Sequence, residues 1–303
     1  MDPLSEVIAL LRPRTVFSKG ISGAGRWSVR YTAFGQPSFC AVLEGGCVLG
    51  VDGQQPVTLQ AGDFVLLPAT PGFTMSGAEP ATPVLIDPTV MPEPTEEVRH
   101  GTPDGPPDLR MLGGYFLFDS PDAALLVSLL PGMVHIRDAE HLSVLVRLVG
   151  REASAQRPGR SLVLARLVEI LLVEALRCAP GEAAPAGLLR GLADERLAVA
   201  LNHMHADPAY PWTVAELAAK AALSRSGFFE RFTRAVGLPP MEYLVAWRMA
   251  LAKDMLRRQD VALAQVAERV GYGSASAFST AFSRHVGQSP SQFARQSTQA
   301  AAA

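Results

Sequence analysis

The sequence contains few cysteines and no long apolar run. Its 303 residues include three cysteines, Cys40, Cys47 and Cys178, and none of them belongs to a C-x-x-C motif. An odd number of scattered cysteines is typical of a reducing compartment, so we expect buried thiols in a cytoplasmic protein. A transmembrane helix needs about 18 consecutive apolar residues, and no stretch is that long. The first residues carry acidic side chains before a short apolar stretch, which is not the pattern of a signal peptide.

The sequence also lacks a large net charge of either sign. The net charge is −2, and so small a value gives no sign of a nucleic-acid partner. From Gly191 to the C-terminus, 12 basic residues outnumber 9 acidic ones, whereas the rest of the chain has 15 basic and 20 acidic residues. The asymmetry is small and favours a basic C-terminal module only weakly.

An internal repeat is the strongest feature that the sequence does contain. The segments SGFFERFTRAVGLPPMEY (226–243) and SAFSTAFSRHVGQSPSQF (276–293) share seven identical residues when they are aligned without gaps. Unrelated segments of this length would share about one. Two copies are too few for a solenoid, which needs about three repeats to bury its core. The repeat therefore indicates one small structural unit that the protein uses twice.

The first copy has the pattern of a helix-turn-helix. Thr213 and Glu216 have the spacing of a capping box at the start of a short helix. After a turn, Ser224 is placed to cap a second helix, which Gly237 ends. A short helix, a tight turn and a second helix with polar groups on its surface make a helix-turn-helix, here over about 213–237.

The second copy repeats this pattern over about 261–287. Its first helix is predicted over 261–270, and its turn reads GYG. Ser274 or Ser276 begins the second helix, and Gly287 ends it. The phenylalanines of both copies are spaced four residues apart, so we expect them to be buried rather than to stack on bases.

The segment between the copies predicts a long helix with one apolar face. It reads PMEYLVAWRMALAKDMLRR and places Leu244 and Trp247 on one side. About 18 helical residues span roughly 27 Å, whereas neighbouring major grooves on one face of B-DNA lie about 34 Å apart. Such a rod can place two recognition helices in neighbouring grooves. A further helix is predicted before the first copy, over 192–206, with Asp207 and Pro208 as its stop.

The N-terminal part has the pattern of a β structure. Short Val, Leu and Phe runs between glycine turns predict strands over 27–86, in a small antiparallel barrel or sandwich. The segment 87–108 is rich in Pro, Gly and acidic residues, and we expect an exposed, mobile loop. MLGGYFLFD (111–119) predicts one more strand.

The pattern changes to helices near Asp122. HLSVLVRLVGRE and SLVLARLVEILLVEALR predict helices with broad apolar faces, which pack within their own domain or form a homodimer interface. The fold class is therefore predicted to be α+β. The predicted divisions are a β-barrel over 1–119, a helical and dimer-forming segment over 120–177, a linker over 178–191 and a helical domain over 192–297.

The C-terminal residues resemble the AraC/XylS-type bacterial transcription regulators. The resemblance rests on WTVAELAAKAALSRSGFFERFTRAVGLPPMEYL, WRMALAKDMLRR and LAQVAERVGYGSASAFSTAFSRHVGQSPSQF, and it extends over about 192–296. It implies a DNA-binding domain with two subdomains, which usually also contacts RNA polymerase. Through PLSEVIALLRPR, RWSVRY, LQAGDFVLLP and GGYFLFD, the N-terminal part resembles the cupin-like sensor barrels that often precede such domains.

The cupin resemblance does not extend to a metal site. Metal-binding cupins place a histidine pair and a carboxylate in the barrel strands, whereas the corresponding strand here, FCAVLEGGCVLG, has no histidine. Relatives often carry histidines where this chain reads ATPGFTM, and cysteine where it has Gly113. His203 and His205 are two residues apart on a predicted helix, so their side chains point in different directions. We therefore expect no metal and no cofactor, which argues against a metal-dependent dioxygenase or isomerase.

The resemblance implies which residues contact double-stranded DNA. In the first copy, Ser226, Phe229 and Glu230 fall where base-reading residues usually sit. Glu230 can accept a hydrogen bond from a cytosine N4 amine, and Phe229 can contact a thymine methyl group. The full set that we predict to contact DNA is Ser224, Arg225, Ser226, Gly227, Phe229, Glu230, Arg231, Arg234, Ser274, Ser276, Ser279, Thr280 and Arg284.

The two copies differ in the chemistry that they offer to DNA. Arg225, Arg231 and Arg234 are candidates for phosphate or guanine contacts, with a solvated helix face as the alternative. The second copy presents short, uncharged groups, with Arg284 beside them. We therefore expect the first copy to supply most of the sequence specificity.

The barrel offers a candidate ligand site of apolar and aromatic residues. These residues either line a pocket for a small molecule or simply fill the barrel, and both readings stay open. The candidates are Trp27, Phe39, Val42, Phe64 and Leu66. A third hypothesis is oxidant sensing through Cys40 and Cys47, against which two buried structural thiols are favoured.

Together these patterns predict a sequence-specific, DNA-binding transcription regulator rather than an enzyme. The expected partners are double-stranded DNA, RNA polymerase, a small-molecule effector and a second copy of the chain, with no membrane. The resemblance favours activation of transcription. The alternative is a metal-independent cupin enzyme or a cysteine redox sensor fused to the DNA-binding module.

Overall fold

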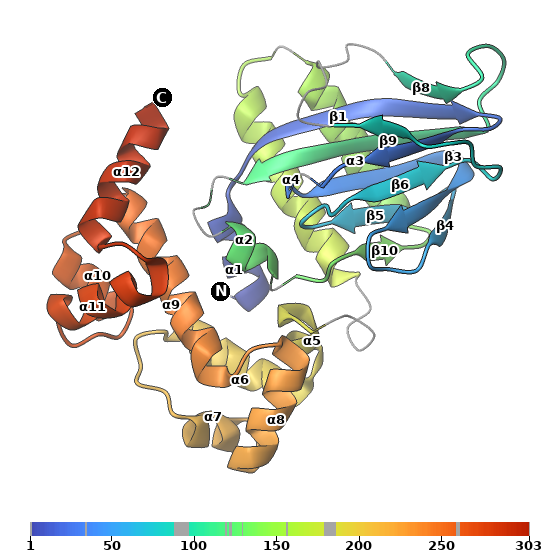
Figure 1. Ribbon diagram of the computed structural model, residues 1–303. Helices are drawn as coiled ribbons and strands as arrows, with labels where there is room; N and C mark the ends of the chain where they lie inside the picture. Colours follow the sequence, from blue (N-terminus) through green and yellow to red (C-terminus); the bar gives the residue numbers. More distant parts are fainter. Residues whose placement is uncertain are drawn as a thin grey trace. The chain divides into compact units, whose positions relative to one another are not determined.

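The chain forms two compact units in the computed structural model (Figure 1). The structure describes residues 2–33, 35–87, 97–118, 120, 123–128, 130–155, 157–178, 186–258 and 261–302. One unit, here called the barrel unit, contains residues 12–119 and 131–179. The other, the helical unit, contains residues 1–11, 120–130 and 180–303.

The barrel unit is a curled sheet with helices packed on one face. Its strands are β1 (Pro13–Ala24), β2 (Ser28–Tyr31), β3 (Ser38–Val51), β4 (Val57–Gln60), β5 (Phe64–Leu67), β6 (Phe73–Ser76), β7 (Val84–Ile86), β8 (Val98–Gly101), β9 (Leu109–Phe118) and β10 (Val134–Ile136). The main path runs β7-β2-β6-β3-β9-β1-β8, with β4 and β5 paired to β3, and β10 to β5. Helices α3 (Glu140–Ser154) and α4 (Arg160–Arg177) pack against each other and against β1.

Three strands lie where the sequence predicts none, and one of them, β10, falls in the segment predicted to be helical. Strand β1 precedes the predicted β region, and β8 lies inside the segment that we expected to be a loop. The two pair in parallel, with Ile21 opposite Val98. Residues 88–96 of that predicted loop lie outside the described residues. Pairing with a distant partner can make a strand of a proline-flanked segment, and no local pattern reports such a partner.

The sheet separates its side chains into an inner and an outer face. The inner face holds one apolar core, which includes Trp27, Val42, Cys47 and Met111. A β-bulge interrupts β3, because Val42 pairs with Met111 and Glu44 with Arg110. The extra residue shifts the alternation by one position, so that both Val42 and Cys47 face inward.

The helical unit contains the C-terminal helices together with α1. Its helices are α1 (Pro3–Leu11), α2 (Ala123–Ser128), α5 (Leu188–Ala193), α6 (Glu195–Ala206), α7 (Val214–Lys220), α8 (Arg225–Val236), α9 (Pro240–Arg258), α10 (Leu263–Arg269), α11 (Ala275–Val286) and α12 (Pro290–Ala302). Within the described part of the chain, no helix is long and apolar enough to cross a membrane.

Helix α1 groups with the helical unit rather than with the barrel that follows it in sequence. It buries Leu4, Val7 and Leu11 and contacts α2, α6 and α9. The domain division that we predicted from composition assigned residues 1–119 to the barrel. The compact units differ from that division, because burial of this apolar face, not chain order, decides which unit α1 belongs to.

A buried polar group joins α1 to α6 and α9. The Nδ1 atom of His205 lies 2.9 Å from Glu6 Oε2, and its Nε2 atom lies 2.7 Å from the Tyr243 hydroxyl. The imidazole also stacks on Trp247, with 4.1 Å between the ring centroids. Every polar atom of the ring therefore has a partner, which allows it to be buried.

The predicted helix over 192–206 begins later than expected. Asp194 separates α5 from α6, because its carboxylate accepts hydrogen bonds from the backbone N–H groups of Arg196 (3.1 Å) and Leu197 (3.3 Å). An aspartate in this role ends one helix and caps the next. Helix α5 also occupies the end of the predicted linker, whose residues 179–185 lie outside the described ranges.

Candidate functional site

The first helix-turn-helix has the predicted caps. Thr213 and Glu216 form a capping box, in which each side chain accepts a hydrogen bond from the other residue's backbone N–H group. Ser224 caps α8 by accepting a hydrogen bond from the Gly227 N–H group at 3.2 Å. Gly237 ends α8 with a left-handed φ of 85°. These local predictions are confirmed.

Helix α8 divides into a buried and an exposed face. Phe228 and Phe232 are fully buried, which confirms that the phenylalanines with this spacing belong to the core. The predicted base-reading residues Ser226, Phe229 and Glu230 are all exposed. Phe229 leaves 43% of its surface in solvent, so its ring is accessible to a partner. Ser224, Arg225 and the half-buried Gly227 lie at the same end of the helix.

Arg231 contacts a neighbouring helix cap, unlike the predicted base-reading residues, which are exposed. Its guanidinium forms an ion pair with Asp194, the residue that caps α6. Burial alone would raise the pKa of Asp194, but the hydrogen bonds from Arg231 and from backbone amides lower it below its ordinary value. With Arg234 and Arg196, this pair lines a depression of about 600 Å³ beside α8. Part of the positive charge predicted to face DNA is therefore held by a neighbouring carboxylate.

The second helix-turn-helix caps its second helix in the same way, although Ala262 at the start of α10 has no side-chain cap, and its predicted reading face is less charged. Ser274, not Ser276, caps α11, since its hydroxyl accepts a hydrogen bond from the Ala277 N–H group at 3.1 Å. Gly287 ends the helix with a φ of 82°. Phe278 and Phe282 are fully buried. The predicted DNA contacts Ser274, Ser276, Thr280 and Arg284 are exposed, and Ser279 is half-buried.

Helix α9 contributes to the cores of both helix-turn-helix units. Near its start, Tyr243 packs edge-on against Phe232, with ring centroids 5.8 Å apart. Further along, Met249 and Leu256 belong to the core cluster that contains Phe278 and Phe282. Its 19 residues span about 28 Å. The connecting helix is therefore a shared structural element rather than a flexible linker.

The structure does not bring together the barrel residues that we predict to line a ligand site. Trp27 and Val42 face inward and belong to the inner core. Phe39 instead lies on the outer face, where it stacks on Phe116. Phe64 and Leu66 lie on that face too, because β5 pairs them with Ala41 and Phe39 of β3. Side chains alternate along a strand, so the bulge and the register decide which residues share a face. These five residues do not line one pocket.

The cysteines of the barrel are held as thiols. Cys40 packs against the inner core and Cys47 belongs to it. Burial raises the pKa of both thiols, that of Cys47 to about 12 and that of Cys40 further, with the neighbouring Cys47 adding to the effect. The thiolate is the reactive form, so neither residue has the environment of an oxidant sensor.

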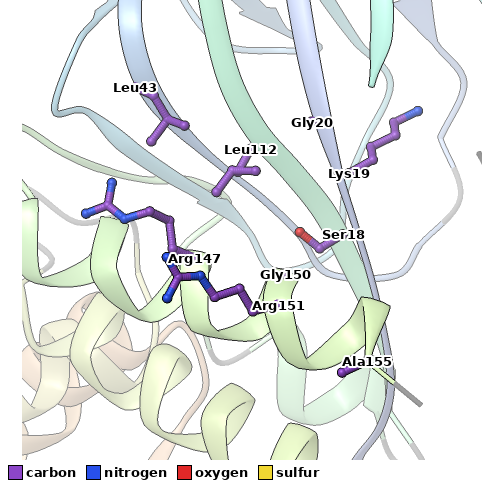
Figure 2. Close-up of a pocket in the computed structure, with 9 residues that line it drawn as sticks. All are labelled: Ser18, Lys19, Gly20, Leu43, Leu112, Arg147, Gly150, Arg151 and Ala155. Carbon is purple, nitrogen blue, oxygen red and sulfur yellow. The ribbon is translucent and has the colours of Figure 1, made fainter. Parts of the chain in front are cut away.

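A pocket that the sequence did not reveal lies between the sheet and α3 (Figure 2). Ser18, Leu43 and Leu112 contribute from three strands, and Arg147 and Arg151 from the helix. These residues are scattered over more than a hundred positions of the chain and form no motif. Among the residues that the structure describes, no group of three or more histidine, cysteine and acidic side chains is placed to hold a metal ion.

Comparisons with known proteins agree with this architecture. Residues 2–179 match the family model described as Cupin, and residues 217–296 match that of a helix-turn-helix domain. A putative AraC-like transcription regulator of Streptomyces lividans is 38% identical over 98% of this chain and 99% of its own length. A protein of Streptomyces antibioticus with the same description is 38% identical over 97% of this chain and 98% of its own. The solved DNA-binding domain of AdpA, in complex with a target DNA, is 34% identical, with a TM-score of 0.30 over 35% of this chain and 91% of that one.

Proposed function

The chain belongs to the AraC-like transcription regulators, and from this premise we propose that it activates transcription by binding one operator through both of its helix-turn-helix units. The barrel unit, in this proposal, senses a small molecule and carries the surface that joins two copies of the chain. The regulator works in the cytoplasm and contacts RNA polymerase, as the family resemblance implies. The function itself, sequence-specific DNA binding by a transcription regulator, follows from the family.

One observation carries the role assigned to α8. Its buried phenylalanines fix the helix by one face, which leaves Ser226, Phe229 and Glu230 on the opposite, solvent-facing side. A recognition helix presents such residues to base edges in the major groove. Arg225, exposed at the N-terminal end, is suited to a phosphate contact.

Footprinting on the operator tests the use of both units. We expect each protomer to protect two major-groove segments about ten base pairs apart, one for α8 and one for α11. Protection of a single segment would show that the second unit does not enter the groove. A variant with Phe282→Ala, which removes a fully buried ring of the second unit, should lose one segment and retain the other.

Helices α3 and α4 support the proposed dimer. They expose Val144 and Leu148 on α3, and Leu162, Val163 and Ile170 on α4, each with at least 42% of its surface in solvent. The two helices contact each other, and an exposed apolar surface of this kind is typical of an interface.

Sedimentation equilibrium tests the dimer surface. We expect Leu148→Glu or Ile170→Glu to shift the chain toward monomer, because a charge on an apolar interface must be desolvated. Val199→Glu is the matched control, since Val199 is a similarly exposed residue on α6 (40%) outside this surface. Equal effects of all three changes would contradict the assignment.

A further inference from the structure

We propose that the barrel unit binds a small organic carboxylate in the pocket between the sheet and α3, outside the barrel core. This inference deepens the sensing role proposed above and rests on it, because it names the site and the chemistry of the effector. The pocket has a volume of about 670 Å³, which falls within the roughly 300–1,000 Å³ of small-molecule sites. The inner face of the sheet, in contrast, is packed with apolar side chains.

Two arginines give the pocket its charge. Arg147 and Arg151 are one helical turn apart on α3 and both are exposed. Figure 2 shows both guanidinium groups extending to the same side, while the Lys19 side chain points away from them. Among the described residues, neither arginine has an ion-pair partner, and like charges at this spacing destabilise a helix. An anion bound between them would remove that repulsion.

A serine hydroxyl provides a further polar group. Ser18 lies on β1 and lines the pocket, and its Oγ atom is buried without a hydrogen-bond partner in the described part of the chain. Gly150 stands opposite on α3, where a Cβ atom would be 3.6 Å from this oxygen. Gly150 has no side chain that could offer this oxygen a hydrogen-bond partner. A buried hydroxyl without a partner is costly, so an oxygen of the ligand would stabilise it.

The opposite wall of the pocket is apolar. Leu112 and Leu43 contribute to it from β9 and β3. Leu43 is the extra residue of the β-bulge between Val42 and Glu44, and bulges frequently re-aim a side chain beside a functional site. A pocket with a cationic end and an apolar wall suits a carboxylate on an apolar body better than an inorganic anion. The planar guanidinium matches the carboxylate group with two parallel hydrogen bonds.

The site has a direct route to regulation. Arg147 is the immediate neighbour of Leu148, which belongs to the proposed dimer surface. A ligand held by one side of α3 therefore acts on the helix that forms part of the contact between two copies. This arrangement would link effector binding to the spacing of the two DNA-binding units in a dimer.

Calorimetric titration of the full-length protein, without DNA and at constant ionic strength, tests the proposal. The probes are hexanoate and cyclohexanecarboxylate. The control compounds are hexanamide, which lacks the negative charge, and inorganic phosphate, which lacks the apolar body. We expect the two carboxylates to bind and to raise the melting temperature, and the amide and phosphate to do neither. Arg147→Gln and Arg151→Gln should each weaken binding about tenfold or more, and Ser18→Ala less.

Two controls separate loss of the site from loss of the fold. Arg166→Gln removes an exposed arginine of α4 that pairs with Glu169 and does not line the pocket, and it should leave the affinity unchanged. The double variant Arg147→Gln/Arg151→Gln without ligand should melt no lower than the wild type, because it loses only a like-charge repulsion. Equal affinity of this double variant for the carboxylates overturns the proposal. Absence of any carboxylate binding overturns it as well.

Failure of the pocket proposal and failure of the proposed DNA function give different experimental results. Carboxylate binding by a protein that protects no operator would contradict the proposed function and support the pocket. Operator protection by a protein that binds none of the carboxylates would contradict the pocket alone.

Discussion

Helices α8 and α11 are built alike but present different chemistry. Each has 12 residues, a serine at its N-cap and a glycine with left-handed φ at its end. The differences lie on the exposed faces, where Arg225 and Glu230 of α8 correspond to Ala275 and Thr280 of α11. The repeat is therefore a repeat of caps and core. The exposed surface, which we propose contacts DNA, differs between the copies.

The two turns also differ. Four residues separate α7 from α8, whereas five separate α10 from α11. The first turn holds Ala222 at a left-handed φ of 52°, and the second holds Gly271 at 79°. A Cβ atom on Gly271 would lie 2.5 Å from the carbonyl oxygen of Ala209. The second turn thus requires glycine for conformation and for space, whereas the first accommodates alanine.

Exchanging these turn residues should produce the largest effect. We expect Gly271→Ala to reduce the free energy of unfolding by about 2–3 kcal/mol, because it combines backbone strain with a steric conflict. The reverse change, Ala222→Gly, relieves a strained φ and should stabilise the protein by about 0.5 kcal/mol. Urea denaturation measures both, and changes of the same sign would contradict the difference between the turns.

The reading faces should differ in specificity. Glu230→Ala should lower discrimination at one base pair by about 1–3 kcal/mol, because it removes the carboxylate that we propose accepts a hydrogen bond from cytosine. Thr280→Ala, the matched change in α11, should cost less. Competition between operator variants gives both values. A uniform loss of affinity for all sequences in the Glu230→Ala variant would show that this residue does not read a base.

The buried imidazole of His205 makes stability depend on pH. Burial lowers the pKa of His205 below its ordinary value of about 6.5, whereas the carboxylates of Glu6 and, more weakly, Asp2 oppose this shift. The imidazole also contacts Tyr243 and Trp247. The unfolded chain therefore takes up the proton first, and stability present above the ordinary pKa is lost as the pH falls toward the folded value. The loss is at most about 1.4 kcal/mol per pH unit.

Unfolding measured between pH 5 and pH 7.5 checks this expectation. His205→Gln should flatten the profile in that range. His285→Gln, which changes an exposed histidine of α11, should leave it unchanged. An unaltered slope in the His205 variant would place the pH dependence elsewhere.

The smallest effect is expected from changes at single proposed phosphate contacts. Arg225→Ala should reduce the slope of log K against log salt by about one, and Ala275→Arg should increase it by a similar amount. Arg231→Ala should change the slope less than Arg225→Ala does, since Asp194 already neutralises much of its charge. Equal slopes for the two arginine variants would show that the ion pair opens on DNA.

What the sequence predicted correctly is mainly local. The capping box at Thr213, the serine caps and the glycine ends depend on residues within four positions of one another, and each is found as predicted. The buried phenylalanine pairs follow from helical spacing in the same way. These features need no knowledge of the rest of the chain.

What the sequence did not reveal depends on distant partners. Arg231 forms an ion pair with Asp194, which lies 37 positions earlier in the chain. Residues of β8 form a strand through their pairing with β1. The sequence predicts that Phe39 and Val42 line one site, yet strand alternation places them on opposite faces of the sheet. The pocket lined by Ser18 is formed by the packing of α3 against three strands of the sheet, so no spacing in the sequence could indicate it.

The grouping of α1 with the C-terminal helices bears on how the protein can be dissected. A fragment that begins at the linker would keep both helix-turn-helix units but would lose Glu6 and the apolar face that covers parts of α6 and α9. We expect such a fragment to be less soluble than the intact protein and to recover when a peptide of residues 1–11 is supplied. The helical unit is thus assembled from segments that lie far apart in the sequence, so proteolysis near Arg12 would cut the covalent connection between α1 and the helices it packs against.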